Sequence, residues 1–515
     1  MTTMPSGALS QSKLVGVIGS GTMGAGIAQV PAVVGHPVAL FDTRTDAAPN
    51  AIQGIRQNFE KLVSKGRFSS EAVESTLARL RAASSLNELR GAGIVIEAVV
   101  EDLEPKRLVF AELEKLVDTK CILATNTSSL SVMAIAAGLR APQRLVGMHF
   151  FNPVPAMDLV EVISGMATDS ESLNTVHATA AAWGKTPVYA KSTPGFIVNR
   201  VARPYYGEAL LLLAEQAASP ATIDAVMSEA GGFRMGPFEL MDLVGLDIGF
   251  AVGQSIFGAL FGDPRYRPSL IQQEMVRAGF LGRKTKRGFH EYGENAPAPQ
   301  PDTEPPAARP KCVTLLSAGS LAEALAKRLA ESGVTIARTP SQTDHRNSVQ
   351  VGDALLAVTD GRSATQMARE TGHQNLVVVD LALDYLKATR LAITRASGCD
   401  EGAYLSAVGL LQSAGYAVSS LKDVPGIAVM RTVAMLVNEA ADVVHQGVAT
   451  VADVDVATRK GVNYPRGPLA WADEIGIETI QEVLTNLAAH HSGDRYGVSP
   501  RIRQLIWSGG TFHGA

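Results

Sequence analysis

A histidine and a glutamate twelve positions apart are the residues of this chain best suited to acid–base chemistry. The segment that holds them, His149-Phe-Phe-Asn152-Pro-Val-Pro-Ala-Met-Asp-Leu-Val-Glu161, predicts two strands joined by a proline-rich turn. Side chains on paired strands can meet across the ladder. The carboxylate could then hold the imidazole in one tautomer and stabilise its protonated form. A buried histidine bonded to a structural carboxylate would give the same pattern, so the pair alone leaves both interpretations open.

A glycine-rich turn near the N-terminus could bind a phosphate. Gly19-Ser-Gly21-Thr22-Met23-Gly24 follows a predicted strand (13–18) and opens a predicted helix (22–34). In that context Gly21 lets the backbone approach a pyrophosphate at the helix N-terminus. A tight turn packed for steric reasons is the alternative.

The next strand ends at Asp42, about 20 residues beyond the glycines. A carboxylate there can accept a hydrogen bond from a ribose 2′-hydroxyl and would repel a 2′-phosphate. NAD is therefore favoured over NADP, although a cation, Arg44, stands nearby. The alternative for Asp42 is a solvated strand end.

The elements around these residues predict five domains or segments. Short apolar runs alternate with helical patterns up to residue 192, which indicates a mostly parallel, doubly wound sheet. From Thr193 the apolar spacing becomes helical, including all of 197–216. Six prolines in 293–310 indicate an extended linker with little that could pack. The predicted boundaries are a Rossmann-type NAD-binding domain (13–192), an all-helical domain (193–290), the linker (291–310), a degenerate Rossmann-like domain (311–421) and a second helical domain (422–515).

An internal duplication supports this division. Thr193-Pro-Gly-Phe-Ile matches Val424-Pro-Gly-Ile-Ala, and Gly236-Pro237 matches Gly467-Pro468. The same offset of 231 positions relates four further pairs: Arg200 and Arg431, Glu208 and Glu439, Asp224 and Asp455, Asp242 and Asp473. A constant offset over so many identities indicates two copies of one helical domain.

Composition excludes several classes of function. The chain has 515 residues and a formal net charge of −4, so it has no basic footprint for nucleic acid. Its most apolar stretch, 248–262, is shorter than the ~18 residues of a membrane span, and residues 1–18 lack the apolar core of a signal peptide. The three cysteines form no metal-binding or disulfide pattern, which favours a reducing compartment and no metal. We expect a cytoplasmic protein.

Four motifs in one order resemble the L-3-hydroxyacyl-CoA dehydrogenase family. They are the glycine turn, Asn126-Thr-Ser128-Ser-Leu, HFFNPVP with its downstream glutamate, and Thr193-Pro-Gly-Phe-Ile-Val-Asn199-Arg. The resemblance covers about residues 13–290 and implies an NAD-binding domain followed by a helical domain that dimerises. The two-copy length resembles the family's long form, the 3-hydroxybutyryl-CoA and 3-hydroxyadipyl-CoA dehydrogenases of β-oxidation and bacterial phenylacetate breakdown.

The resemblance implies a role for each matching residue. His149 would be the catalytic base and Glu161 its partner, with Ser128 and Asn199 around the C3 oxygen of an acyl-CoA substrate. Besides the glycine turn and Asp42, the matching cofactor contacts are Glu101, Lys106, Asn152 and Lys284. Lys65 matches a lysine that meets coenzyme A. Asn58 departs from the serine of some members, which concerns only a contact to the coenzyme A tail.

The second copy is predicted to be inactive. Aligning Lys13 with Lys311 places Ser317 at Gly19, Ala322 at Gly24 and Pro340 at Asp42. At the 231 offset Asn199 becomes Met430, and no histidine in the second half precedes a glutamate by twelve positions. A second binding site of different specificity is the alternative to a structural role. Packing of the helical copies on one another would give an internal pseudo-dimer in place of, or in addition to, a homodimer.

Two other functions share these features. An NAD-dependent dehydrogenase of a free hydroxy acid or sugar acid would have the same N-terminal fold, and a non-enzymatic NAD-binding protein would keep the glycines. The acyl chain, C4 or dicarboxylic C6, is not set by any motif. Arg200, Arg203 and Arg234 are the candidates for binding a distal carboxylate.

Overall fold

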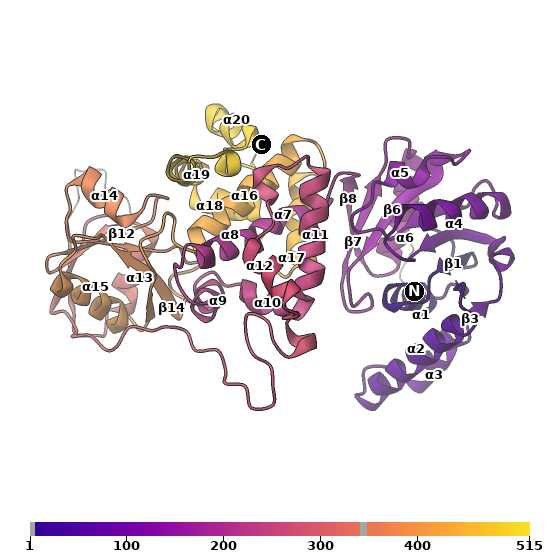
Figure 1. The fold of residues 1–515 in the computed structure, drawn as a ribbon, viewed down its shortest axis with the longest axis horizontal. Coiled ribbons are helices and arrows are strands. Elements are labelled where there is room, and N and C mark those ends of the chain that lie inside the picture. The colour runs from indigo at the N-terminus through magenta and orange to yellow at the C-terminus, as the bar shows by residue number, and fades with distance from the viewer. Residues whose placement is uncertain (1–5, 340–347, 515) are drawn as a thin grey trace. The chain divides into compact units, whose positions relative to one another are not determined.

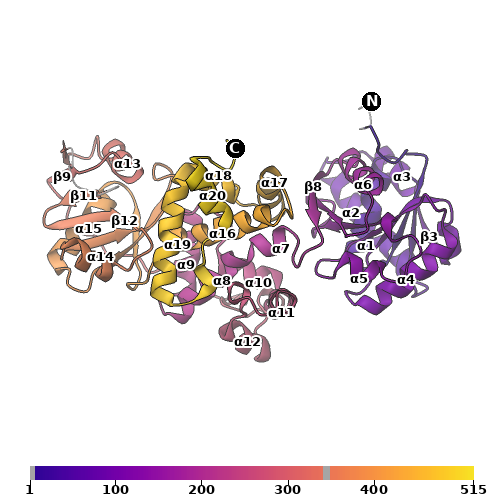
Figure 2. The same cartoon turned by 90° about the horizontal axis from the view of Figure 1, so that it is seen from above.

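The computed structural model describes residues 6–339 and 348–514. Its contacts divide the chain into two compact units. The first holds the residues up to Arg200 together with Gln446–Val462, and the second holds Val201–His445 with the residues from Asn463 onward. Figure 1 labels many of the elements of each unit, and Figure 2 shows the same ribbon from above.

The first unit is built on an eight-stranded sheet in the order β3-β2-β1-β4-β5-β6-β7-β8. Every neighbouring pair is parallel except β6 and β7, which form an antiparallel pair. The predicted mostly parallel, doubly wound sheet is therefore confirmed. The strands are β1 (Leu14–Ile18), β2 (Val38–Phe41), β3 (Leu80–Ala83), β4 (Ala92–Glu97), β5 (Ile122–Thr125), β6 (Leu145–Phe150), β7 (Leu159–Ser164) and β8 (Thr186–Lys191).

Helices cover this sheet, and most of them begin at a capping side chain. Ser69, Asp102, Ser131 and Asp169 each accept a backbone N–H of the first turn that follows them, which satisfies a donor that the helix leaves free. The helices of this unit are α1 (Thr22–Val33), α2 (Ala47–Ser64), α3 (Ser70–Leu77), α4 (Leu103–Leu116), α5 (Val132–Ala136), α6 (Ser170–Ala182), α7 (Val198–Val201, at the boundary of the two units) and α17 (Val451–Gly461).

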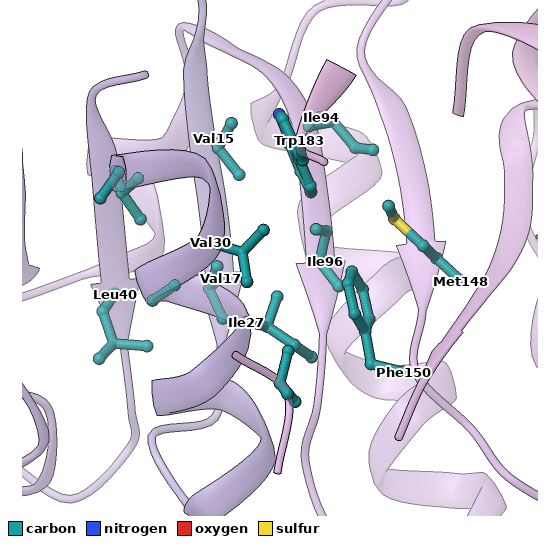
Figure 3. Packing of buried hydrophobic residues seen from close by; sticks show 14 of the residues in the cluster. Val15, Val17, Ile27, Val30, Leu40, Ile94, Ile96, Met148, Phe150 and Trp183 are labelled. Atoms are coloured by element: carbon teal, nitrogen blue, oxygen red, sulfur yellow. The ribbon is translucent and has the colours of Figure 1, made fainter. Parts of the chain in front are cut away.

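A core of apolar side chains fixes α1 against the sheet. Figure 3 shows Ile27 and Val30 of α1 pointing toward side chains of the central strands, among them Val17, Ile96 and Phe150. These residues are almost fully buried. Removing apolar surface from water is favourable, by roughly 25 cal/mol per Å². The burial of these side chains therefore stabilises the position in which the N-terminus of α1 lies at the end of β1.

The second unit contains most of the two helical copies. The first copy supplies α8 (Arg203–Ala214), α9 (Pro220–Glu229), α10 (Pro237–Val244), α11 (Leu246–Ala259) and α12 (Leu270–Arg277). The second copy supplies α16 (Val429–His445), α18 (Pro468–Ile475), α19 (Ile477–His491) and α20 (Pro500–Ser508). Among the described residues no single helix has the length and apolarity of a membrane span; only α10 and α11 together would, and they are bent by 98°.

The predicted helical segment 197–216 is interrupted where its duplicate is continuous. The chain forms α7 and then α8, whereas α16 runs unbroken over the matching positions. Pro204 stands in the first turn of α8, and the matching residue of α16 is Met435. Proline lacks a backbone N–H and fits best in the first turn of a helix, which explains why a new helix begins here.

The two helical copies pack on one another through buried ion pairs. Glu208 of α8 is fully buried and accepts from Arg431 (2.8 Å), Arg495 (2.6 Å) and Tyr496 (2.8 Å) of the other copy. Burial alone would raise the pKa of Glu208, but Arg495 and Arg431 outweigh it and hold the pKa below its usual range.

Part of this contact recurs with the copies exchanged. Glu439, the duplicate of Glu208, bonds to Tyr266 and lies 3.6 Å from Arg265. Contacts that repeat reciprocally are those of an isologous interface. Within the second unit the two helical copies therefore pack directly on one another.

The second unit also contains a smaller, seven-stranded sheet in the order β10-β9-β11-β12-β13-β14-β15. Its elements are β9 (Cys312–Leu315), α13 (Ser320–Arg328), β10 (Thr335–Arg338), β11 (Ser348–Val351), β12 (Ala354–Val358), α14 (Ala364–Thr371), β13 (Leu376–Val379), β14 (Arg390–Arg395), α15 (Glu401–Ser413) and β15 (Ala417–Ser420). β9 and α13 begin at the positions that the alignment of Lys13 with Lys311 assigns to β1 and α1, which confirms that alignment.

The proline-rich linker makes more contacts than its composition predicts. It forms no helix or strand, but Glu304 donates its N–H to the carbonyl of Val418 on β15 (2.8 Å). The Asp302 carboxylate accepts from Thr222 (2.9 Å), and Ala307 donates to the Gln412 side chain (2.8 Å). Backbone and polar groups rather than an apolar face hold the linker, which hydrophobic patterning does not detect.

Replacing Glu208 should show how far the second unit depends on this interface. We expect Glu208→Gln to lower its free energy of unfolding by ~3–5 kcal/mol, because the change leaves buried guanidinium groups without their counter-charge. Calorimetric unfolding measures the change. Glu104→Gln, which breaks an exposed pair with Arg107 on α4, is the control and should cost at most ~1 kcal/mol. Equal changes in the free energy of unfolding for the two variants would contradict the role of Glu208 in the interface between the helical copies.

Candidate active site

The glycine turn has the geometry of a phosphate-binding loop. Gly19 has a φ of +94°, and a Cβ there would stand 2.4 Å from the carbonyl oxygen of Ala98. A Cβ on Gly24 would stand 1.7 Å from the Gly19 oxygen, so only glycine lets α1 begin this close to β1. A Cβ on Gly21 would meet nothing within 4 Å. The backbone at Gly21 therefore faces open space at the N-terminus of α1, as binding of a pyrophosphate requires.

The sheet topology places this turn at its switch point. The chain passes from β1 outward to β2 and β3 and then returns to β4 on the other side of β1. The ends of β1 and β4 are adjacent, since Ala98 donates its N–H to the carbonyl of Ile18 (2.7 Å). In open α/β sheets, ligands bind beyond the carboxyl ends of the strands at such a point.

Asp42 lies beside the glycine turn, directly after β2. Its carboxylate accepts from the backbone and hydroxyl of Ser20 (2.9 and 2.7 Å) and from Arg44 (3.0 and 3.2 Å). Partial burial would raise the pKa of Asp42, but the bonds from Arg44 and Ser20 outweigh it and lower the pKa. The ionised carboxylate is thus held where a ribose 2′-hydroxyl can donate to it, and Arg44 is turned toward Asp42. The residues present fit NAD.

His149 and Glu161 face each other on β6 and β7. They are direct partners in the antiparallel register, and Nδ1 of His149 lies 2.7 Å from Oε2 of Glu161. The prediction that the two meet across a strand pair is confirmed. Both side chains are buried, and the other carboxylate oxygen, Oε1, accepts the backbone N–H groups of Ile197 (3.0 Å) and Val198 (2.9 Å).

These two donors come from the Thr193-Pro-Gly-Phe turn. Phe196 closes the turn with an N–H to the carbonyl of Thr193 (2.9 Å) and has a φ of +46°. Its ring lies 5.8 Å from the imidazole centre, and that of Phe151 lies 4.5 Å away. The imidazole is therefore held between aromatic rings and a carboxylate whose remaining bonds are to backbone.

Glu101 organises the loop that carries Ser128. Its Oε1 accepts from the Thr127 hydroxyl (2.6 Å) and from the backbone and hydroxyl of Ser128 (2.8 and 3.2 Å). Burial would raise the pKa of Glu101, but the charge of Lys106 and the hydrogen bond from Thr127 outweigh it and lower the pKa. Ser128 and Glu101, both predicted from the sequence, are thus in contact.

Glu97 is a buried carboxylate that the sequence analysis missed. It ends β4, is fully buried, and accepts from Lys106 (2.7 Å) and Thr125 (2.7 Å). Lys106 also lies 3.2 Å from Glu101. A glutamate at the end of an otherwise apolar strand was the available signal. The predicted cofactor contacts of Glu101 and Lys106 stay predictions.

The remaining predicted residues come from several different elements. Asn199 lies in α7, directly after Val198. Asn152 is exposed in the turn after β6. Lys65 is exposed at the end of α2, as Asn58 is within it. Lys284 belongs to the second unit, where it pairs with Asp247 (2.6 Å). Their ligand contacts stay predictions.

Of the three arginines considered for a distal carboxylate, Arg234 is exposed, whereas Arg200 is buried and donates to Gln446 (2.8 Å). Arg203 lies over the Tyr206 ring, and burial lowers its pKa.

The second sheet has lost both parts of this site. Ser317, at the position of Gly19, accepts the N–H of Ser348 on β11 (2.8 Å), so the turn is bonded to its own sheet. Pro340 lies outside the described residues. Asp380 occupies the position of His149, and its carboxylate accepts from the N–H groups of Ala428, Val429 and Met430. Complete burial raises the pKa of Asp380 to about 6, against the lowering effect of these bonds.

Comparison with known proteins agrees with this geometry. Residues 14–193 match the family model for the 3-hydroxyacyl-CoA dehydrogenase NAD binding domain. The model for the C-terminal domain of the same family matches twice, at 195–292 and 426–511, which confirms the duplication. Residues 356–425 match the 3-hydroxybutyryl-CoA dehydrogenase reduced Rossmann-fold domain.

Similar proteins cover both halves of the chain. It is 41% identical to the 3-hydroxyadipyl-CoA dehydrogenase of Escherichia coli K12 over 96% of this chain and 98% of the relative. The crystal structure of 3-hydroxybutyryl-CoA dehydrogenase from E. coli K12 aligns with a TM-score of 0.87 at 40% identity, covering 97% of this chain and all of that one. The 3-hydroxybutyryl-CoA dehydrogenase of Clostridioides difficile is 41% identical over 54% of this chain and 99% of its own length.

The fold and the site define an NAD-dependent oxidoreductase with a histidine–glutamate pair beside a dinucleotide-binding sheet. The chain belongs to the 3-hydroxyacyl-CoA dehydrogenase family.

The position of Asp42 predicts the effect of removing its carboxylate. We expect Asp42→Ala to raise KM for NAD by ~10-fold, the equivalent of ~1.4 kcal/mol, because the ribose loses a charge-assisted hydrogen bond. The kcat should change little, since Asp42 does not contact the reacting atoms. Steady-state kinetics with NAD and NADP tests this. An unchanged KM for NAD would contradict the proposed ribose contact.

Proposed function

We propose that this chain oxidises (S)-3-hydroxyacyl-CoA thioesters to 3-oxoacyl-CoA with NAD, and that His149 is the general base. The observation that carries the proposal is the 2.7 Å contact between Nδ1 of His149 and the buried Glu161 carboxylate. NAD supplies the acceptor for the hydride that leaves C3. The residues that would hold it are those of the glycine turn and Asp42.

The partners of Glu161 set the tautomer of His149. Oε1 accepts two backbone N–H groups, which fits an ionised carboxylate that can only accept. Nδ1 must then carry the proton and donate it to Oε2. This leaves the lone pair of Nε2 to take the hydroxyl proton of the substrate.

The same carboxylate stabilises the charge that the reaction creates. When Nε2 takes the hydroxyl proton, the imidazole becomes a cation 2.7 Å from Glu161. Because both groups are buried, this attraction is stronger than it would be in water. As the C3–H bond breaks and its electron pair leaves as hydride, the O–H electrons form the carbonyl, and His149 holds the released proton.

Two polar side chains are proposed to orient the substrate's C3 oxygen. Ser128 has its backbone fixed by Glu101, and Asn199 directly follows Val198, whose N–H is bonded to Glu161. Each can hydrogen-bond an alcohol or a carbonyl oxygen. Lys65, exposed at the end of α2, offers a cation for the phosphates of coenzyme A.

The relatives differ in the acyl group that their names give. The E. coli relative is a 3-hydroxyadipyl-CoA dehydrogenase, and other relatives are 3-hydroxybutyryl-CoA dehydrogenases. We propose the dicarboxylic C6 thioester as the preferred substrate, because the relative with that name matches nearly the whole length of this chain. We further propose that the enzyme acts in the cytoplasm in phenylacetate breakdown, with an internal pseudo-dimer and no nucleic-acid or membrane partner.

Replacement of the base tests the mechanism. We expect His149→Gln to lower kcat by ~10²–10⁴-fold, the usual contribution of a positioned general base, while NADH binding is unchanged. His513→Gln, outside the site, is the control and should turn over at the parent rate. Wild-type turnover by His149→Gln would show that the base is assigned incorrectly.

Acyl preference can be measured in the reduction direction. With NADH, we expect kcat/KM for 3-oxoadipyl-CoA to exceed that for acetoacetyl-CoA. A cationic side chain of the enzyme would pair with the distal carboxylate, which acetoacetyl-CoA lacks. Equal or reversed values would refute the C6 preference and leave the reaction class intact.

A further inference from the structure

A segment of the second helical domain folds into the first unit and covers an edge of its sheet. β8 ends the strand order, so one side of it has no neighbouring strand. The N–H of Lys191 on β8 donates to the carbonyl of Val448 (2.9 Å). α17, which follows Val448, contacts both β7 and β8. An exposed strand edge thus has a partner from residues 446–462.

The end of α17 packs closely on two residues next to the catalytic carboxylate. Gly461 is the last residue of the helix and is buried. A Cβ at Gly461 would stand 2.7 Å from Cδ2 of Leu159 and 3.0 Å from Cγ2 of Val198. The nearby pair of Lys460 and Asp158 (2.9 Å) is half exposed on both sides and adds little stability. The contact therefore depends on close packing around a glycine.

Two hydrogen bonds connect this contact to the imidazole of His149. Val198 donates its N–H to Oε1 of Glu161 (2.9 Å), and Oε2 of Glu161 bonds to Nδ1 of His149 (2.7 Å). Leu159 lies on β7, two residues before Glu161 and on the same strand. A shift of α17 would thus displace Val198, which donates to the Glu161 carboxylate. It would also displace Leu159, which lies on the same strand as Glu161.

The duplicate keeps this support although it has lost the chemistry. Lys422 and Ala217 are the duplicates of Lys191 and Val448 at the 231 offset, and Lys422 donates its N–H to the Ala217 carbonyl (3.0 Å). α9, the duplicate of α17, contacts β14, the duplicate of β7. The edge contacts are therefore retained on both sheets, whereas among the described residues only the first sheet has a histidine–glutamate pair.

We propose that α17, through Gly461, is a positioning element for the catalytic pair: the second helical domain holds the Thr193–Val198 turn and thereby the Glu161 carboxylate. This inference rests on the proposed function, in which His149 is the base. It gives the inactive half of the chain a part in the reaction without contact to the substrate.

The test compares two valine substitutions on the same helix of the full-length enzyme. Gly461→Val places three carbons against Leu159 and Val198, whereas Ala452→Val adds bulk on the exposed side of α17. A misplacement of ~1 Å can lower a rate by ~10²-fold, so we expect kcat of Gly461→Val to fall at least ~10-fold. KM for NAD should not change, because α17 packs on β7 and β8, whereas the glycine turn follows β1. Ala452→Val should match the parent.

The pH profile distinguishes positioning from loss of stability. If Val198 withdraws its N–H, Glu161 keeps more of its charge for the imidazolium, which favours the protonated ring. The acid limb of kcat/KM for oxidation should therefore move to higher pH in Gly461→Val. Adding Leu159→Ala to Gly461→Val removes the leucine carbons that the new side chain would meet. This double variant should recover the parent kcat and the parent position of the acid limb. Gly461→Ala, which adds one carbon, replaces the valine variant if that variant does not fold.

The outcomes separate this inference from the proposed function. A parent enzyme without 3-hydroxyacyl-CoA dehydrogenase activity would overturn the proposed function. An active parent whose Gly461 variant has the kcat and acid limb of Ala452→Val would overturn the positioning role alone. A lower kcat with an unmoved acid limb would also overturn it, because the route through Glu161 requires the shift.

Discussion

The site depends on one buried carboxylate that is bonded on both of its oxygens. Glu161 accepts two backbone N–H groups on Oε1 and faces Nδ1 of His149 through Oε2. A buried charge is tolerated only when such partners replace water. The antiparallel β6–β7 pair supplies the imidazole at the right register, and the Thr193–Val198 turn supplies the two donors. The sheet, the turn and the histidine therefore meet at this single carboxylate.

The second half shows which contacts remain where the histidine–glutamate pair is absent. The turn before α16 still presents N–H groups, and they still require an acceptor. Asp380 provides it from the strand position that His149 occupies in the first half, while Ala392 stands in place of Glu161. The requirement for backbone hydrogen bonds is thus met by one carboxylate, and the proton-transfer group is gone. The reciprocal helix contacts persist because they bury apolar surface and cover strand edges, which both halves need for stability.

Local sequence signals predicted most of the fold and the core of the site. Glycine spacing, a proline-rich turn and alternating apolar residues act over a few positions, so the β1–α1 turn and the pairing of His149 with Glu161 could be read directly. Contacts that join distant segments could not: nothing near Gly461 indicates that it packs on Leu159, and the burial of Glu97 with Lys106 appears only when β4 and α4 are placed. The offset of 231 applied to His149 leads to Asp380, so the sequence could have indicated this residue. A second histidine–glutamate pair was the pattern considered, and Asp380 does not belong to such a pair.

The most direct test of the account is the tautomer of His149. Nitrogen-15 NMR of histidine-labelled enzyme, with the His149→Gln variant to assign the signal, reports which ring nitrogen carries the proton when the imidazole is neutral. The account predicts a proton on Nδ1, where Glu161 accepts it, and an unprotonated Nε2. A neutral ring protonated on Nε2 would contradict it, because that nitrogen could not then take the proton of the substrate alcohol.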